Sequence, residues 1–547
     1  MPGRGPVARL RRGLEKDAVV RWGLVALIVF TPLAFGTVEG WSIALLEWGI
    51  LSLVLAAAAG FVLRGLARTE WRRTGVEWPL ALFLALVALQ GVPLPEALVR
   101  PLAPGAFRAH HSAEGAPQGG LSTPGDFEAL RARLELQPEG RFQPISVNRG
   151  ETWARGRLLG TLVLMFLLVS IWAARTERAL FLIRAVIITG FVVALFGVVQ
   201  QLTWNGKLYW LRPTSRDGGF GPFVNHNHFA GYVEMILPLA IVMAYYLLDL
   251  RRRQTAEEPP PAWDGAEPPA ERDWLDDSQA AVGRWGQWVL ALFAAILLLG
   301  SLVLSGSRGG LLSAVLSGGL LFVALWRRIR PRALAWGVAA ALPVLAVLLA
   351  AWIGTDLVRL GNPGHSVERE ASFHSRWVIW KDVAHHFPEA GAAGFGLGTF
   401  EESFAPDTPP GTAQRWDRAH NDYLQIAWET GGIGALLILW GGLAFAWRYL
   451  ASALRSPAHP LDLFRVAIAV ALTSLLLHSI VDFNLQIGSN AFLFALLAGL
   501  LVAIQRIVER DTAAGEPEGT GTPQRLHLAG EPRILEPMTT GRPGDLP

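Results

Sequence analysis

The sequence contains no cysteine among its 547 residues, and it carries little charge. The absence of thiols excludes disulfides and thiolate metal ligands, and it leaves the redox compartment undetermined. Asp, Glu, Lys and Arg make up only 17% of the residues, against about 25% in soluble domains. Hydrophobic residues make up 52%, and the mean hydropathy is +0.34. This composition indicates a membrane protein. Its basic residues are mainly arginines beside apolar runs, so nucleic acid is not an expected partner.

Long apolar runs predict the spanning segments. A helix needs about 20 apolar residues to cross the hydrocarbon core of a bilayer, and about twelve segments approach this length. They lie near 22–38, 41–63, 78–94, 156–174, 179–202, 228–248, 286–304, 310–326, 333–353, 430–447, 461–481 and 488–505. The predicted fold class is therefore all-α: a polytopic membrane protein with about 12 transmembrane helices. A large periplasmic loop, carrying amphipathic helices, completes it.

Arginine clusters predict the orientation of these helices, because cytoplasmic connections are enriched in Lys and Arg. With the N-terminus inside, every cluster falls on the cytoplasmic side. The clusters are Arg11–Arg12, Arg64–Arg73, Arg175–Arg178, Arg251–Arg253, Arg327–Arg332 and Arg448–Arg455. The short outer turns 39–40 and 482–487 contain neither Lys nor Arg. Both termini are then cytoplasmic, and the connections 95–155, 203–227 and 354–429 lie outside.

This topology divides the chain into four parts. They are a cytoplasmic N-terminal segment (1–21), helices one to five with outer loop 95–155 (22–202), a core of helices six to twelve with outer loop 354–429 (203–505), and a cytoplasmic tail (506–547). The tail is rich in Gly, Pro and Glu, a composition typical of disorder. The acidic, Pro-rich segment 251–284 is interpreted as a cytoplasmic linker.

The first polar motif lies just before the sixth helix, where Arg212 and Arg216 precede Asn225, Asn227 and His228. Polar side chains at a helix N-terminus favour an anion, because the free N–H groups point towards it. The alternative is that one asparagine only caps the helix. A metal site is not favoured, since no carboxylate or third histidine stands nearby in the sequence.

Arg308 lies in the outer turn Ser305-Gly-Ser-Arg-Gly-Gly, and it breaks the charge pattern of the short outer turns. Its guanidinium presents a planar fork of donors that suits a phosphate. A snorkelling arginine is the alternative. We favour a role in a binding site.

The loop 354–429 carries the third set of motifs. The run from His374 to His386, which contains Arg376, predicts an amphipathic helix in the plane of the membrane interface. Gly391–Gly398 is interpreted as a flexible turn rather than a nucleotide loop, because no strand precedes it. The loop then closes on Arg415-Trp-Asp-Arg-Ala-His420-Asn421-Asp422-Tyr423, at the start of the next helix.

His420 is the natural acid–base candidate of that closing run, because histidine titrates near neutral pH. A structural histidine at a helix start is the alternative. In the eleventh helix His478 and Asp482 are spaced i,i+4, which predicts one shared face near the outer end. Ionisable residues in a membrane segment are functional candidates, although a structural pair is equally compatible with the pattern.

Taken together, these motifs resemble the O-antigen ligase and O-antigen polymerase family. The resemblance rests on an ordered set that covers roughly 205–500. Its members are Gly221-Pro-Phe-Val-Asn-His-Asn-His-Phe-Ala, Gly306-Ser-Arg-Gly, the run Arg376–Trp380, Gly394-Phe-Gly-Leu-Gly-Thr-Phe, His420-Asn-Asp-Tyr and His478-Ser-Ile-Val-Asp-Phe. Each motif alone is weak, and the ordered set is specific.

The resemblance implies a glycosyltransferase of the bacterial inner membrane, with its active site on the periplasmic face and without a cofactor or metal. The donor would be a glycan on undecaprenyl diphosphate. A ligase would pass it to lipid A-core, and an O-antigen or exopolysaccharide polymerase to a second lipid-linked glycan. By similarity, Arg308 would hold the diphosphate and His420 would be catalytic. Arg216, or else Arg212, would be the second phosphate-binding arginine.

A secondary transporter is the rival from a different class. It would account for twelve helices around a central cytoplasmic linker. It would not account for an outer loop as long as 354–429 that is rich in Trp, His and Arg. Transporter sites also tend to interrupt helices near the middle of the membrane, and no such interruption is evident in the apolar runs.

Overall fold

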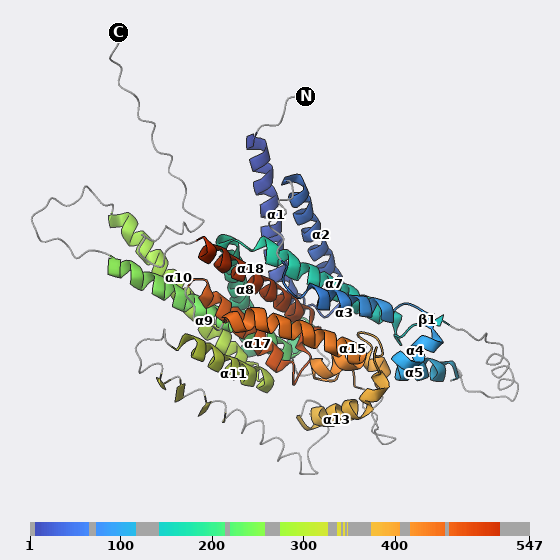
Figure 1. The fold of residues 1–547 in the computed structure, drawn as a ribbon. Coiled ribbons are helices and arrows are strands. Elements are labelled where there is room, and N and C mark those ends of the chain that lie inside the picture. The colour runs from blue at the N-terminus through green and yellow to red at the C-terminus, as the bar shows by residue number, and fades with distance from the viewer. Residues whose placement is uncertain are drawn as a thin grey trace, which may run out of the picture.

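A computed structural model describes residues 6–64, 73–115, 142–213, 219–257, 274–326, 373–404, 416–453 and 459–514, with isolated positions between 336 and 347. Several predictions fall outside these ranges: Arg216, the middle of loop 95–155, most of the predicted helix 333–353, and the tail beyond residue 514. The described chain is predominantly helical, as the sequence predicts (Figure 1).

The long helices are α1 (Pro6–Leu33), α2 (Gly40–Arg64), α3 (Glu77–Gln90), α7 (Arg149–Trp172), α8 (Thr176–Leu202), α9 (His226–Glu257), α10 (Trp274–Leu304), α11 (Arg308–Leu325), α13 (Phe373–Ala390), α15 (Asp422–Phe445), α17 (Asp462–His478) and α18 (Gly488–Ala513). Short elements are α4 (Glu96–Leu102), α5 (Pro104–Gly115), α14 (Phe400–Ser403), the π-helical turn η1 (Ala446–Leu450), α16 (Ala451–Ala453) and the 3₁₀ turn η2 (Asn484–Gln486). Two small antiparallel ribbons pair β1 (Leu94–Pro95) with β2 (Phe142–Gln143), and β3 (Lys207–Leu208) with β4 (Arg212–Pro213).

Eight of the described helices are long and apolar enough to cross a membrane. They are α2, α7, α8, α9, α10, α11, α15 and α18. The apolar part of α1 (Ala18–Leu33) and helix α3 are shorter, and α17 has 17 residues. All eleven helices coincide with predicted segments, whereas the count of about twelve spans is not established. Helix α9 ends at Glu257 and α18 at Ala513, so both run beyond the apolar segments that predicted them.

Helices α9 and α18 form the centre of the bundle, where 67% and 72% of their apolar windows are buried, against 17% for α15. Helix α9 packs against α8, α10, α11 and α17, and α18 packs against α7 and α17. Lipid tails are as apolar as leucine, so close packing rather than water exclusion holds such helices together. At Gly190 of α8, an added Cβ would lie 2.8 Å from the Ile236 side chain of α9.

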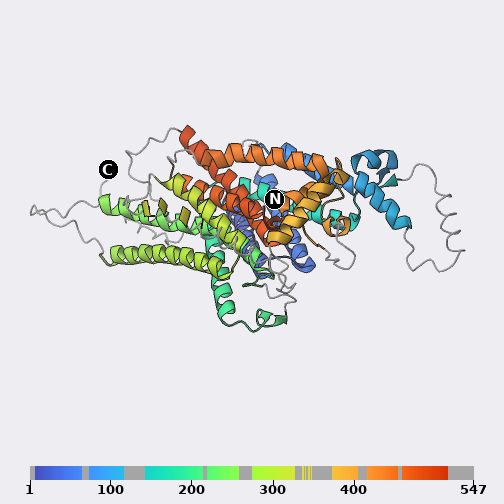
Figure 2. The ribbon, with the colours of Figure 1, turned by 90° about the horizontal axis from the view of Figure 1, so that it is seen from below.

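A second, smaller region lies at one end of the bundle and includes α4, α5 and α13 (Figures 1 and 2). Its own apolar core includes Val99, Ile379, Val383, Phe395 and Trp428. The last of these belongs to α15, so the region is joined directly to the bundle. The far end of α9 and the start of α10 lie at the opposite end, as both views show.

The glycine run is a turn, as the sequence predicts, but it is packed rather than open. Gly391, Gly394, Gly396 and Gly398 all have positive φ. The turn lies against a break in α15 at Gly431, whose φ is 66° and ψ is −168°. A Cβ at Gly394 would lie 2.3 Å from the Glu429 carbonyl oxygen. Only glycine permits both the conformation and this close approach.

Candidate functional site

Asp482 is the centre of a buried polar cluster. It lies in the loop between α17 and α18, and only 1% of its side chain is exposed. Its Oδ1 lies 3.8 Å from Nδ1 of His420 and 3.9 Å from Nε2 of His228. Its Oδ2 lies 3.5 Å from Nη2 of Arg376. Arg376 also donates through Nη1 to the carbonyl of Val481 at 2.5 Å. The fold thus brings together residues that are far apart in the chain.

The charges around Asp482 decide its protonation. Burial alone would raise the pKa of its carboxyl group, but the Arg376 guanidinium and the imidazoles of His420 and His228 hold that pKa well below its usual value. Because opposite charge nearby favours the ionised form, Asp482 is a carboxylate at neutral pH. It can therefore stabilise positive charge on an adjacent imidazole.

His420 is held in an unusual backbone conformation. Its φ is 49°, in the left-handed region, which costs a non-glycine residue about 1–2 kcal/mol. Bonds on both sides maintain it: Trp380 Nε1 donates to the Ala419 carbonyl at 3.0 Å, and Asp422 N donates to the Ser479 carbonyl at 3.0 Å. Strain of this kind concentrates at functional sites. Here the conformation keeps the His420 ring beside Asp482.

Asn421, Asp422 and Tyr423 anchor the start of α15. The Asn421 side chain caps the helix by accepting from the backbone N–H groups of Tyr423 and Leu424, each at 3.0 Å. The Asp422 carboxylate accepts from Leu485 N at 2.9 Å. The Tyr423 hydroxyl donates to the Leu476 carbonyl at 2.8 Å. These contacts fix α15 to both sides of the Asp482 loop, so they position His420.

His228, in the first turn of α9, joins the cluster, while Asn225 caps the helix. Asn225 accepts from the backbone N–H of Asn227 at 2.8 Å, which is the capping role that the sequence left open. His228 is buried, and its ring centroid lies 4.8 Å from that of Phe483. Its backbone carbonyl accepts from Asn490 of α18 at 3.0 Å.

His478 has a different partner from the one that its spacing suggests. Helix α17 ends at His478, so Asp482 lies in the following loop and the two residues do not share a helix face. His478 Nδ1 instead lies 3.1 Å from Oε1 of Glu234 on α9, and their side chains are 1% and 0% exposed. Sequence reasoning missed Glu234. An ionisable residue inside an apolar span was the signal that could have identified it.

Arg308 is the first residue of α11 and is half-buried. Ser307 caps this helix by accepting from Gly310 N at 3.2 Å. A Cβ at Gly309 would lie 3.0 Å from the His478 ring, and one at Gly310 would lie 2.7 Å from the Ala230 side chain. The two glycines therefore let the start of α11 approach α9 and α17, which places the backbone next to Arg308 beside His478 and Val481, the residue before Asp482.

The second arginine motif is resolved only in part, because Arg216 lies outside the described residues. Arg212 Nη2 forms a 2.7 Å ion pair with Oε1 of Glu39, in the turn between α1 and α2. Its guanidinium carbon also lies 4.8 Å from the ring centroid of Phe35. Arg212 is exposed and engaged in this local contact.

A small polar cavity of about 140 Å³ opens next to these motifs. It lies where the end of α8, the segment before α9 and the turn between α10 and α11 meet. Its lining residues are Gln201, Trp204, Gly219, Phe220, His226, Leu304 and Ser305. The cavity thus borders both the α9 motif and the turn that carries Arg308.

Several buried polar atoms of the cluster have no hydrogen-bond partner. They are Nε2 of His228, Nδ1 of His420, Nε of Arg376 and Oδ2 of Asp482. Most buried polar groups in native proteins are hydrogen-bonded, so each exception calls for an explanation. Within the described ranges, no group of three or more His, Asp or Glu side chains is arranged to hold a metal ion. The arrangement suits acid–base chemistry beside a bound anion.

Residues 293–439 match the family described as O-antigen ligase. This finding confirms the resemblance that the ordered motifs indicate. The match covers part of the chain, and it includes Arg308, Arg376 and the run His420–Tyr423 but not Asp482. No curated protein matches the chain.

Proposed function

We propose that this membrane protein, which carries an O-antigen ligase segment, transfers a glycan from undecaprenyl diphosphate to an acceptor hydroxyl. The transfer takes place on the periplasmic face of the bacterial inner membrane, and both termini are cytoplasmic. The convergence of His420, Arg376 and His228 on the buried carboxylate of Asp482, at the end of the bundle that also carries Arg308, is the observation that supports this function most. The O-antigen ligase match does not favour a transporter.

His420 is the general base of this proposal. Its Nδ1 faces Asp482, so Nε2 is the nitrogen that remains for the acceptor. As the acceptor oxygen attacks the anomeric carbon, its proton moves to Nε2. The bond from the anomeric carbon to the diphosphate breaks, and its electron pair leaves with undecaprenyl diphosphate. Attack from the opposite face inverts the anomeric centre. The Asp482 carboxylate stabilises the imidazolium that forms.

Arg308 stabilises the negative charge that develops on the leaving diphosphate. Fixed cations in a site shielded from water act strongly on such charge, and the guanidinium fork binds two phosphate oxygens at once. Arg216 is the proposed second phosphate ligand, with Arg212 as the alternative. Arg376 acts on Asp482 rather than on substrate, and it is a positioning residue.

Arg308→Lys tests the diphosphate role, because it keeps the charge and loses the fork. Transfer by the purified full chain, measured with a lipid-linked donor and acceptor, should fall in this variant while its thermal stability remains close to wild type. Unimpaired transfer would exclude bidentate phosphate binding. Arg510→Lys, on the exposed far end of α18, is the matched control.

Ligase and polymerase activities differ in their acceptor, lipid A-core or a second lipid-linked repeat unit. A deletion strain separates them when lipopolysaccharide and lipid-linked glycans are resolved by size. Long glycan left on undecaprenyl diphosphate, with bare lipid A-core, identifies a ligase. Single repeat units on the core identify an O-antigen polymerase. Normal profiles in both fractions direct the search to an exopolysaccharide.

A further inference from the structure

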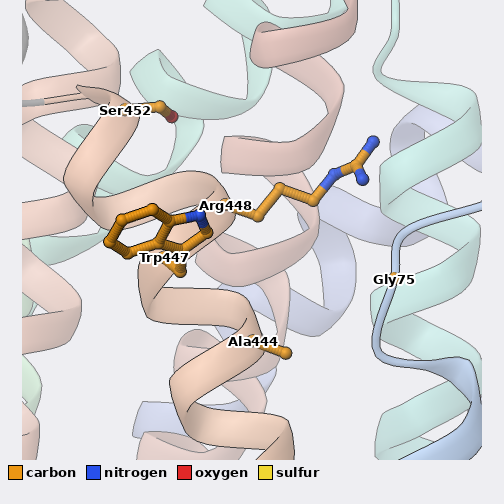
Figure 3. Close-up of a pocket in the computed structure, with 5 residues that line it drawn as sticks. All are labelled: Gly75, Ala444, Trp447, Arg448 and Ser452. Carbon is orange, nitrogen blue, oxygen red and sulfur yellow. The ribbon is translucent and has the colours of Figure 1, made fainter.

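A larger cavity lies at the other end of α15, far from the polar cluster. Its volume is about 500 Å³, and it is lined by Gly75, Ala444, Trp447, Arg448 and Ser452 (Figure 3). Ligand pockets typically span about 300–1,000 Å³. The motifs and the proposed transfer reaction use none of these residues, so this cavity calls for a separate explanation.

The walls of this cavity are tied together by the π-helical turn η1 that follows α15. Within this turn the Tyr449 hydroxyl donates to the Thr74 carbonyl at 2.7 Å, which fixes the turn against the segment before α3. Gly75 has φ +89°, and a Cβ placed there would lie 3.6 Å from Cδ of Arg448. Figure 3 shows the Arg448 side chain reaching from the helix towards Gly75. Single π-helical turns occur frequently at functional sites.

Arg448 gives this cavity a positive charge that no carboxylate neutralises within the described part of the chain. Its guanidinium carbon lies 5.8 Å from the ring centroid of Tyr449. The acidic group next to Gly75 is Glu77, whose carboxylate accepts from the backbone N–H groups of Thr74 and Gly75. Nearby Arg465, by contrast, is paired with Asp462. A side-chain hydrogen bond joins Arg448 to Tyr449, and the other donors of its guanidinium can bind an external anion.

The position of the cavity along α15 corresponds to the opposite surface of a membrane. The candidate membrane span that contains α15 runs from Asp422 to Ala453, so His420 lies just before one end of it and Arg448 lies near the other. Trp447 is 75% exposed beside Arg448, as expected of an indole at headgroup depth.

The surface of α15 below the cavity is apolar. Leu436, Leu439 and Leu443 are 67%, 56% and 61% exposed, and they follow one another at helical spacing. An acyl chain can lie along this row while a headgroup occupies the cavity above it. A soluble anion would make no use of the row. The combination of a cation, an interfacial indole and an apolar track therefore matches a phospholipid.

We propose that this cavity binds the phosphate of an anionic phospholipid in the leaflet opposite the transfer site. Arg448 holds the phosphate through charge-assisted hydrogen bonds, Trp447 packs against the glycerol region, and the acyl chains lie along α15. The proposal does not depend on the transfer reaction.

The test is lipid binding to the full-length purified protein, measured by native mass spectrometry with phosphatidylglycerol and phosphatidylcholine of equal chain length. Wild type should bind phosphatidylglycerol more tightly. Arg448→Gln should weaken that binding about fivefold to tenfold, as expected for one charged contact, and should remove the preference between the lipids. Arg448→Lys should retain part of it.

Two controls keep the result decisive. Arg510→Gln removes one charge from the same end of the bundle, outside the cavity, and should bind as wild type does; thermal unfolding midpoints of all variants confirm that they are folded. Equal binding of both lipids, or unchanged phosphatidylglycerol binding by Arg448→Gln, would overturn the proposal. Competition by inorganic phosphate as strong as that by phosphatidylglycerol would assign the cavity to a free anion instead.

Discussion

Two polar regions contact α15: the glycine turn lies against its break, and the Asp482 cluster lies at its start. They differ in whether their buried polar atoms are hydrogen-bonded. Around the glycine turn, the Gln90 side chain donates to the carbonyls of Ala393 and Glu429 at 2.7 and 2.8 Å and accepts from Leu397 N at 3.1 Å. Glu429 accepts from Gly398 N at 2.7 Å. In the Asp482 cluster, by contrast, buried atoms of four side chains have no hydrogen-bond partner.

This difference separates a structural clamp from a candidate site. A network in which every buried donor and acceptor is paired rigidifies the fold. Atoms left unpaired raise the free energy of the folded protein, and unsatisfied groups of this kind mark a candidate site. Polar density alone therefore does not identify the site.

The largest expected effect is on transfer and comes from His420→Ala. Loss of a general base lowers a rate about 10²–10⁴-fold, whereas stability should change little because this imidazole makes no hydrogen bond through Nδ1. Transfer by the purified chain and its unfolding midpoint measure the two separately. His459→Ala, at the far end of the bundle, is the matched control. Retained transfer in His420→Ala would exclude the general-base role.

Asp482→Asn should affect stability as well as transfer. It leaves the Arg376 guanidinium, 12% exposed, without its counter-charge, and breaking a buried pair costs about 3–5 kcal/mol. Unfolding by denaturant in detergent measures the loss. A variant as stable as wild type would show that the Asp482–Arg376 pair does not hold the loop.

The same carboxylate predicts a dependence on pH. The folded-state pKa of Asp482 lies below its unfolded value, which is about 3.9. Its contribution to stability is therefore present above that unfolded value and is lost as the pH falls through the folded-state pKa. Acid should destabilise wild type over this range, and Asp482→Asn should show a smaller decrease. Equal acid sensitivity of the two proteins would contradict the assignment.

A smaller effect, on stability alone, is expected from Gln90→Leu in the glycine-turn clamp. Each buried group left unpaired costs about 1–3 kcal/mol, so the unfolding midpoint should fall. Transfer per folded molecule should remain near wild type, because the side-chain hydrogen bonds of Gln90 go to Ala393, Leu397 and Glu429. Gln505→Leu, which loses an exposed bond to Glu509 and a 3.3 Å bond from the Ser452 hydroxyl, is the control. A loss of transfer in Gln90→Leu without a loss of stability would contradict the purely structural role of the glycine-turn region.

The smallest effect is expected from Arg212→Gln. Its ion pair with Glu39 is exposed, and such pairs contribute about 0–1 kcal/mol. Transfer should fall less in this variant than in Arg216→Gln, if Arg216 is the second phosphate ligand. The two variants assayed side by side decide between the arginines, and the opposite ranking would assign the phosphate to Arg212.

Much of the architecture could be predicted from the sequence, because apolar runs and arginine clusters are local signals. Eleven described helices coincide with predicted segments, and His420 leads directly into a helix, as its motif indicates. Helix ends were harder to predict. The apolar run 461–481 and the i,i+4 spacing of His478 and Asp482 predicted a helix to the end of this run, but α17 ends at His478 and η2 follows at Asn484.

The sequence by itself determined that this is a helical membrane protein whose motifs resemble the O-antigen ligase family, since composition and the order of motifs can be read without knowledge of contacts. Only the tertiary structure decided which polar residues act together. It paired His478 with Glu234, placed Asp482 between His420 and Arg376, and gave Arg212 to Glu39. The physical reason is that burial and charge pairing depend on which helix ends lie side by side, and the spacing of residues along the sequence does not reveal these contacts.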